Sequence, residues 1–220
     1  MSVSAIVSYD GTPNDDDALA LARVLAGAGA ELTLAYVRHD PAAPDAAWAQ
    51  ELLMRGVAAL GDTAAQTRVV VNPSTSQGLR ELAASEQAQL VIFGSDYRTA
   101  CGRIAPQRST QALLDGGSTA IAIAPAGYRA REIETIGLLA GLDDHASIDT
   151  AHALTQHFQA TVTDRSYNID LLIVGSRPEA QVGRTLISAQ AENALVGTAA
   201  PVLVVARGVA LDFHSPIYIA

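Results

Sequence analysis

Residues 89–127 read QLVIFGSDYRTACGRIAPQRSTQALLDGGSTAIAIAPAG, and residues 170–208 read DLLIVGSRPEAQVGRTLISAQAENALVGTAAPVLVVARG. The two stretches align without a gap at a constant offset of 81 residues (170 − 89). Both begin with an apolar, strand-like run and end with another. Residues identical in both copies include Gly94, Ser95, Gly102, Arg103, Gly116 and Gly127 of the first. An ungapped match with glycines and strands in phase predicts an internal repeat.

The first half of the chain alternates short apolar runs with longer segments of helical spacing. We expect strands at residues 4–9, 32–37, 67–71, 90–93 and 119–124, and helices at residues 14–28, 45–60 and 75–87. Strands that are apolar on both faces, alternating with helices, indicate right-handed crossovers and a parallel sheet. The predicted fold class is therefore α/β.

The second half is a shortened copy. Residues 5–9 lie opposite residues 136–140 at an offset of 131 (136 − 5), so the second copy has lost 50 residues (131 − 81). The loss falls between a helix at 146–160 and the strand that begins near Leu171, and leaves only residues 161–163 of a second strand. So small a sheet cannot bury enough surface alone, and we expect the two halves to dock and unfold together. The predicted organisation is a domain at 1–128, a truncated repeat at 132–210 and a tail at 211–220.

Composition limits the function classes. A net charge of −9 argues against a nucleic-acid or acidic-membrane surface. No apolar stretch approaches the roughly 20 residues that span a bilayer. Cys101 is the only cysteine, so no internal disulfide forms, and the first residues carry no basic leader pattern. The sequence predicts a cytoplasmic protein that contacts neither nucleic acid nor membrane.

Three segments together resemble the universal stress protein family. They are the strand–Asp10-Gly11-Thr12-Pro13–helix segment, Gly94-Ser95 after the fourth strand, and the run from Gly102 to Pro125. The second half, through residues 201–205, resembles another such domain, so the similarity covers residues 3–208. The resemblance implies a five-stranded parallel sheet of order 3-2-1-4-5, the adenine nucleotide alpha hydrolase-like fold, followed by its shortened repeat. It also implies pairing through the last strands, in a dimer or pseudo-dimer.

Many members of this family bind ATP through glycines that follow the fourth strand. The resemblance places Asp10 near the adenosine and Val37 in the adenine pocket. Glycines let backbone amides approach phosphates, yet here Tyr97 and Gln107 stand at two of the glycine positions. Arginine side chains could hold phosphates instead. The candidate nucleotide-binding residues are Asp10, Val37, Gly94, Ser95, Arg103, Arg108, Ser109 and Thr110.

The second half departs further from the family pattern. Pro178 replaces the second glycine, Ser188-Ala189 replaces the last Gly-Ser pair, and Gly141 stands in the place of Asp10. The segment that would supply the adenine wall is missing. We therefore interpret the second half as structural.

Three other clusters have two interpretations each. Asp15, Asp16 and Asp17 are adjacent carboxylates that suggest a metal site, or else complement the positive end of a helix capped by Asn14. His145, Asp149 and His152 share a helix face, either as metal ligands or as a solvated surface. Cys101, between Arg98 and Arg103, is either a reactive thiol or an ordinary loop cysteine.

The sequence thus favours a non-enzymatic universal stress protein: a stress-response binding or adaptor protein, and a homodimer, with a degenerate site for ATP or AMP and no metal. One alternative is a weak ATPase that uses Arg103 and Arg108 to hold phosphates. Another is an interaction module without a ligand. The apolar tail at 211–220 either covers the core or pairs with the sheet edge of another chain.

Overall fold

Nine strands and six helices make up the part of the chain that the computed structural model describes, residues 2–40, 46–61 and 64–213. The first half contains β1 (Ser4–Ser8), α1 (Asp15–Gly27), β2 (Glu31–Arg38), α2 (Ala46–Leu60), β3 (Gln66–Val71), α3 (Thr75–Glu86), β4 (Leu90–Gly94), α4 (Arg108–Leu114) and β5 (Ala120–Ala124). The second half contains β6 (Thr135–Leu139), α5 (His145–Phe158), β7 (Thr161–Thr163), β8 (Leu171–Val174), α6 (Ala189–Gly197) and β9 (Val202–Val204).

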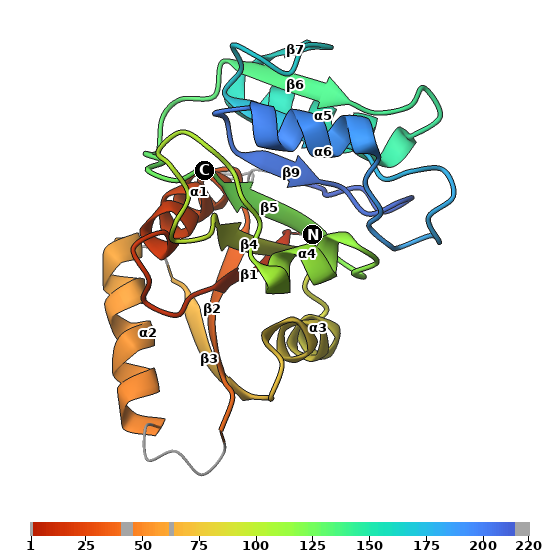
Figure 1. Cartoon of the computed structure of the whole chain (residues 1–220). Coiled ribbons are helices and arrows are strands. Elements are labelled where there is room, and N and C mark those ends of the chain that lie inside the picture. Colours follow the sequence, from red (N-terminus) through yellow and green to blue (C-terminus); the bar gives the residue numbers. More distant parts are fainter. Residues whose placement is uncertain (1, 41–45, 62–63, 214–220) are drawn as a thin grey trace, which may run out of the picture.

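All nine strands join one sheet of order β3-β2-β1-β4-β5-β9-β8-β6-β7, which runs from β3 at the bottom of Figure 1 to β7 at the top. The predicted order 3-2-1-4-5 is confirmed for the first five strands, which are parallel to one another. The expected five-stranded sheet is not separate, however. It continues directly into the four strands of the second half.

The two halves meet at the only antiparallel pair among the described strands, β5 with β9. In this ladder Ala122 lies opposite Leu203, and the two are 81 residues apart (203 − 122). Leu203 is the residue that corresponds to Ala122 in the alignment of the two stretches. When two corresponding residues pair with each other in an antiparallel ladder, a pseudo-two-fold axis passes between them. This is the geometry of an isologous dimer interface, formed here within one chain.

Hydrogen bonds of the segments that follow β4 and β8 correspond at the same offset. The Ser95 hydroxyl donates to the carbonyl of Ala124 at 2.8 Å, and the Ser176 hydroxyl donates to that of Val205 at 2.7 Å. Further backbone pairs correspond: Asp96 to Ala105 with Arg177 to Leu186, Gly102 to Ala126 with Gly183 to Arg207, and Ala126 to Arg103 with Arg207 to Arg184. The two segments therefore adopt the same local structure.

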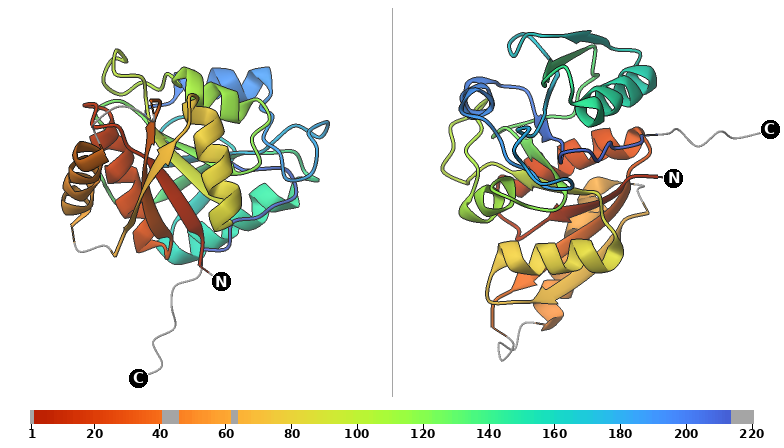
Figure 2. Two further views of the ribbon diagram at one scale, coloured as in Figure 1. Left: turned by 90° about the horizontal axis from the view of Figure 1, so that it is seen from below. Right: turned by 90° about the vertical axis from the view of Figure 1, so that its right-hand side faces the viewer.

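Two hydrophobic layers cover the sheet. One contains α1, α2, α5 and the chain around Leu211 and Phe213, and the other contains α3, α4 and α6. Figure 2 shows α1 and α2 on the opposite side of the first-half strands from α3. Strand residues alternate between the layers: Ala120, Ala122 and Ala124 face the first, and Ile121 and Ile123 the second. Each layer contains residues of both halves, so neither half has a core of its own.

The loop at residues 164–170 stands where the second half lacks the longer segment of the first. A Cβ on Gly137 of β6 would lie 2.4 Å from the Arg165 carbonyl oxygen and 2.8 Å from Cδ1 of Ile169. Glycine is therefore needed where this loop crosses the strand. Ile169 belongs to the same hydrophobic layer as α3, so the loop supplies part of the cover that α3 gives the first half.

The C-terminal segment covers the core as far as it is described. Leu211 and Phe213 are buried, and the Leu211 backbone N–H donates to the Thr150 hydroxyl of α5 at 2.9 Å. Residues 214–220, for which pairing with another chain was the alternative, lie outside the described residues. Within the described part of the chain, no helix combines the length and apolar character needed to cross a bilayer.

Candidate functional site

The candidate site lies at the carboxyl ends of β1 and β4, which are neighbours in the sheet. At this point the strand order reverses, because β1 connects outward to β2 while β4 connects to β5 on the other side. Ligands of open α/β sheets bind at such switch points. The fold therefore brings the loop after Asp10 close to the loop after Gly94.

Gly94 is required by packing. A Cβ at this position would lie 2.0 Å from the carbonyl oxygen of Asn14 and 2.8 Å from its carbonyl carbon. The first turn of α1 thus lies directly against the end of β4. The Asn14 side chain fastens the contact, since its Nδ2 donates to the carbonyls of Ser95 at 3.1 Å and Asp96 at 2.6 Å.

Asn14 is therefore not the side-chain cap that the sequence predicts. It precedes α1 with helical backbone angles and makes no capping hydrogen bond. The prediction is wrong because two carbonyls of the β4 loop, more than 80 positions away, compete for its side chain.

Ser95 also has a structural role. Its side chain is fully buried, and its hydroxyl donates to the carbonyls of Ala124 at 2.8 Å and Arg103 at 3.3 Å. Because its counterpart Ser176 makes the equivalent bond, this serine ties the end of the fourth strand to the end of the fifth in both halves.

The Asp15 carboxyl group accepts hydrogen bonds from the backbone amides of the loop after β1. Its Oδ2 accepts from the backbone N–H groups of Asp10 at 2.6 Å, Gly11 at 2.7 Å and Thr12 at 3.1 Å. Burial and the neighbouring Asp10 carboxyl raise the pKa of Asp15 to about 8, although the amide donors oppose the shift. An internal carboxyl thus occupies a cluster of N–H groups that could otherwise face an anion.

The three adjacent carboxylates do not converge. Asp17 is buried and accepts from the Gly127 backbone N–H at 2.8 Å, with Arg129 3.7 Å away. Burial also raises the pKa of Asp17. Asp16 is exposed. In the part of the chain that the structure describes, no three acidic, histidine or cysteine side chains form a group that could hold a metal.

The other candidate residues divide by exposure. Val37 is buried, and its Cγ1 is 3.1 Å from where a Cβ on Gly78 of α3 would lie, so it packs toward that helix. Thr110 is fully buried, and its hydroxyl has no partner among the described residues. Ser109 is half-buried, whereas Asp10 is exposed and its Oδ1 accepts from the Thr12 N–H at 3.1 Å.

Exposed cations follow the β4 loop. Arg98, Arg103 and Arg108 are all exposed, and Arg98 lies 4.9 Å from the centre of the Tyr97 ring. Among the described residues, the guanidinium groups of Arg103 and Arg108 have no ion-pair or hydrogen-bond partner. These two groups therefore remain available to an anion. Cys101 is exposed on the same loop.

The corresponding edge of the second half contains a cavity of about 300 Å³. It lies between the ends of β6 and β8, beside Gly141, Arg177 and Pro178. The Ser188 side chain caps α6 there by accepting from the Ala191 N–H at 3.1 Å. The structure therefore keeps a hollow at this edge, although the second half lacks the longer segment that precedes β4 in the first half. His145, Asp149 and His152 are exposed on α5.

Sequence reasoning misses Asn14 and Asp15 as organisers of this site. Both belong to a run that has every feature of a helix start, Asn followed by three aspartates. Their actual partners are backbone groups of loops, which leave no signal in the sequence.

No family model and no curated protein matches the sequence. Solved structures do. A functionally unknown protein, PA1789 from Pseudomonas aeruginosa PAO1, is 14% identical with a TM-score of 0.68, over 93% of this chain and 92% of that one. A protein provisionally assigned as a universal stress protein, from Pseudomonas aeruginosa UCBPP-PA14, is 14% identical with a TM-score of 0.63, over 92% of each chain. A universal stress protein in complex with cAMP is 25% identical over 42% of this chain and 75% of its own, with a TM-score of 0.35.

Proposed function

Since this chain has the fold of the universal stress proteins, we propose that it is a non-enzymatic binding or adaptor protein of the stress response. In this proposal the first half binds an adenine nucleotide, ATP or AMP, at the carboxyl ends of β1 and β4. The observation that carries it is the pair Arg103 and Arg108, two exposed guanidinium groups without a described partner in a chain of net charge −9. Arginines hold phosphates by charge-assisted, bidentate bonds.

The side chains present fit a phosphate better than the backbone amides of the β1 loop do. Gly94 is covered by Asn14, and the amides of residues 10–12 already bind Asp15. Tyr97 and Gln107 occupy two glycine positions of the family signature. The surface around Arg103 and Arg108 is exposed and open to a phosphate. We therefore call the site degenerate and expect weaker binding than a glycine-rich loop provides.

The proposal favours binding over catalysis for a specific reason. Hydrolysis needs a carboxylate or another base that is available to position water. Asp10 accepts from the Thr12 amide, and Asp96 accepts from the Arg98 amide at 2.9 Å. Each carboxylate thus orders its own loop through Oδ1, and a base for hydrolysis would have to be its second oxygen. The weak ATPase, with Arg103 and Arg108 as phosphate clamps, is the alternative.

We further propose that residues 132–210 are a truncated copy of the domain at 1–128. The matching hydrogen bonds after β4 and β8 and the pairing of Ala122 with Leu203 support this. Because β9 occupies the free edge of β5, the expected homodimer has to use another surface, such as the outer edge of β3. The cytoplasmic location remains a prediction from the single cysteine.

Isothermal titration with ATP and with AMP tests the nucleotide site. We expect the double variant R103A/R108A to weaken ATP binding roughly tenfold or more, because each loses a charge-assisted contact. The matched control is Arg184→Ala, the repeat counterpart of Arg103, whose guanidinium already donates to the Gly116 carbonyl at 3.0 Å. Its loss should leave nucleotide affinity unchanged.

Three results would revise the proposal. Equal ATP affinity in wild type and R103A/R108A removes the phosphate role of the arginines. No heat with either nucleotide, and none co-purifying by mass spectrometry, favours the interaction module without a ligand. Steady phosphate release that Arg108→Ala abolishes establishes the ATPase alternative.

A further inference from the structure

A second cavity lies at the opposite edge of the sheet, where β1, β2 and β3 begin. It has a volume of about 750 Å³ and is formed by the first residues of these strands together with the last turns of α1 and α3. This volume is in the range of small-molecule sites. Because it faces away from the carboxyl ends of β1 and β4, it is independent of the proposed nucleotide site.

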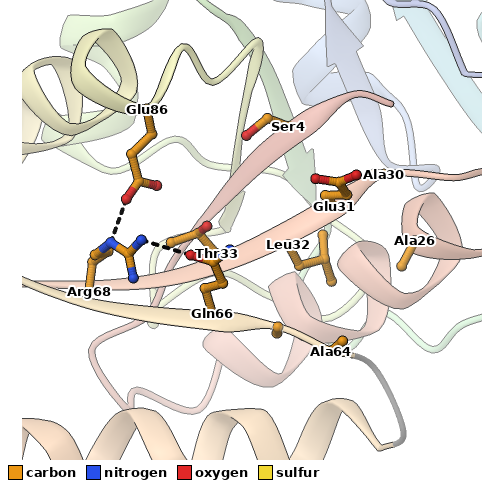
Figure 3. Close-up of a pocket in the computed structure, with 11 residues that line it drawn as sticks. Ser4, Ala26, Ala30, Glu31, Leu32, Thr33, Ala64, Gln66, Arg68 and Glu86 are labelled. Atoms are coloured by element: carbon orange, nitrogen blue, oxygen red, sulfur yellow. Dashed lines mark hydrogen bonds and ion pairs between the residues drawn. The ribbon is translucent and has the colours of Figure 1, made fainter. Parts of the chain in front are cut away.

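The cavity has a polar wall and an apolar wall, as Figure 3 shows. Thr33 alternates with Leu32 along β2, so the two side chains point to opposite faces of the sheet. Ser4, Thr33, Gln66 and Arg68 lie on the face toward Glu86 of α3. Ala26, Ala30, Leu32 and Ala65 form the other wall.

The Thr33 hydroxyl is the feature that points to a ligand. The residue is only 7% exposed and lines the cavity, yet its hydroxyl has no hydrogen bond to any described residue. The Thr33 oxygen is not one of the fully buried unpaired atoms of the described residues, so it is accessible from the cavity. A hydroxyl that opens into a cavity and has no described protein partner is available to a polar group bound there.

The charged residues around the cavity indicate whether the bound group is an anion or a cation. The Arg68 guanidinium is fully used: it pairs with Glu86 and donates to Oε1 of Gln66 at 2.7 Å and to the Thr67 carbonyl at 2.9 Å. Glu31 has no cationic partner among the described residues and accepts a hydrogen bond from the Ser2 hydroxyl. The carboxyl ends of α1 and α3 add negative potential at the same edge. The cavity therefore disfavours anions and favours a cation.

We propose that this cavity binds a small organic ammonium ion with a short aliphatic chain. Its ammonium group donates to the Glu31 carboxylate and to the Thr33 hydroxyl on the face toward α3. Its methylene groups extend past the start of β2 to Ala30 and Leu32 on the other wall of the cavity. An ammonium group supplies three donors, which matches a wall of acceptors. A bare metal ion fits less well, because the described residues offer no cluster of three suitable ligands here.

The test uses 1,4-diaminobutane as the probe and 1,4-butanediol as its neutral counterpart. In ¹⁵N-resolved NMR titrations of the full chain, the diamine should shift the amides of Glu31, Thr33 and Gln66. The diol should shift them far less, because it lacks the charge that Glu31 selects. Equal responses to both compounds, or no response at these amides, would overturn the proposal.

Two variants locate the contacts. Thr33→Val keeps the shape and strand preference of the side chain while removing its hydroxyl, and Glu31→Gln removes only charge. Each should weaken diamine binding roughly tenfold, the cost of one hydrogen bond to a charged group. Glu192→Gln on the exposed face of α6 is the control and should change nothing. Unchanged affinity in both cavity variants, with folding verified by circular dichroism, would refute the assignment. ATP affinity should not change in either variant, so the experiment distinguishes a failure of this proposal from a failure of the proposed nucleotide site.

Discussion

Gly94→Ala tests whether the close contact between α1 and β4 holds the candidate site together. The added Cβ would lie 2.0 Å from the Asn14 carbonyl oxygen, whereas Cβ contacts below 3.0 Å essentially never occur. The obstacle is backbone, so the first turn of α1 has to move by about 1 Å, the difference between these two distances. Overpacking of this kind costs ~1–3 kcal/mol.

The movement also affects the hydrogen bonds of Asn14. Its bonds to the carbonyls of Ser95 and Asp96 are buried or partly buried and are worth ~1 kcal/mol each. We therefore expect Gly94→Ala to lower the free energy of unfolding by ~2–4 kcal/mol. Urea titration followed by circular dichroism measures this, with the fluorescence of Trp48 as a second probe.

The repeat offers a matched control at Gly175. A Cβ there would lie 2.0 Å from Asp144 Oδ2, a side-chain atom that can swing away at the expense of its cap on Ser147. The expected loss is only ~1 kcal/mol, typical of a helix cap. Gly141→Ala, with nothing within 4 Å, should be near neutral. A loss for Gly94→Ala no larger than for Gly175→Ala would refute the argument that a backbone obstacle decides the cost.

Two further predictions concern buried polar groups. The pKa of Asp15, about 8 in the folded protein against an ordinary 3.8, means that the folded state holds a proton that the unfolded state releases. Its contribution to stability is therefore fully present below pH ~4 and lost as the pH rises through 8, and Asp15→Asn should flatten this fall in urea titrations across that range. An unchanged pH dependence in the variant would contradict the assignment. Thr185→Val removes a hydroxyl that donates from the second half to the Leu113 carbonyl at 2.6 Å. The loss should be ~1–2 kcal/mol, seen as a single transition at a Tm lowered by ~2–8 °C, and two separate transitions would show that the halves unfold independently.

The strands of this protein are readable from the sequence because each is an apolar run between turns. The expected strands at 90–93 and 119–124 correspond within one residue to β4 and β5. The short helices α4 and α6 are not among the expected elements, since seven and nine residues give too few turns to establish a helical period.

The site is less predictable than the fold because its polar side chains form hydrogen bonds with groups that are far away in the sequence. Asn14 donates to carbonyls after β4, and Asp17 accepts from the Gly127 amide, 110 positions away. Neither partner is a side chain, so no pattern of residue types records it. The proposed role of Thr33 is equally invisible in the sequence, because it depends on a cavity that forms only through the register of β1, β2 and β3.

The position of the pseudo-two-fold axis explains why the second half can still pair with the first although it lacks its outer strands. The axis lies at Ala122 and Leu203, and the second half keeps the three strands nearest to it, β9, β8 and β6. What is missing lies at the far edge, where only the three residues of β7 remain and where Ile169 provides part of the cover. The antiparallel join also points the carboxyl ends of β4 and β8 in opposite directions, so the second half cannot supply a wall to the first-half site. Under our proposal the second half covers the edge of β5. A ligand site of the first half therefore consists of first-half residues, and a partner chain has to bind a surface other than the edge of β5.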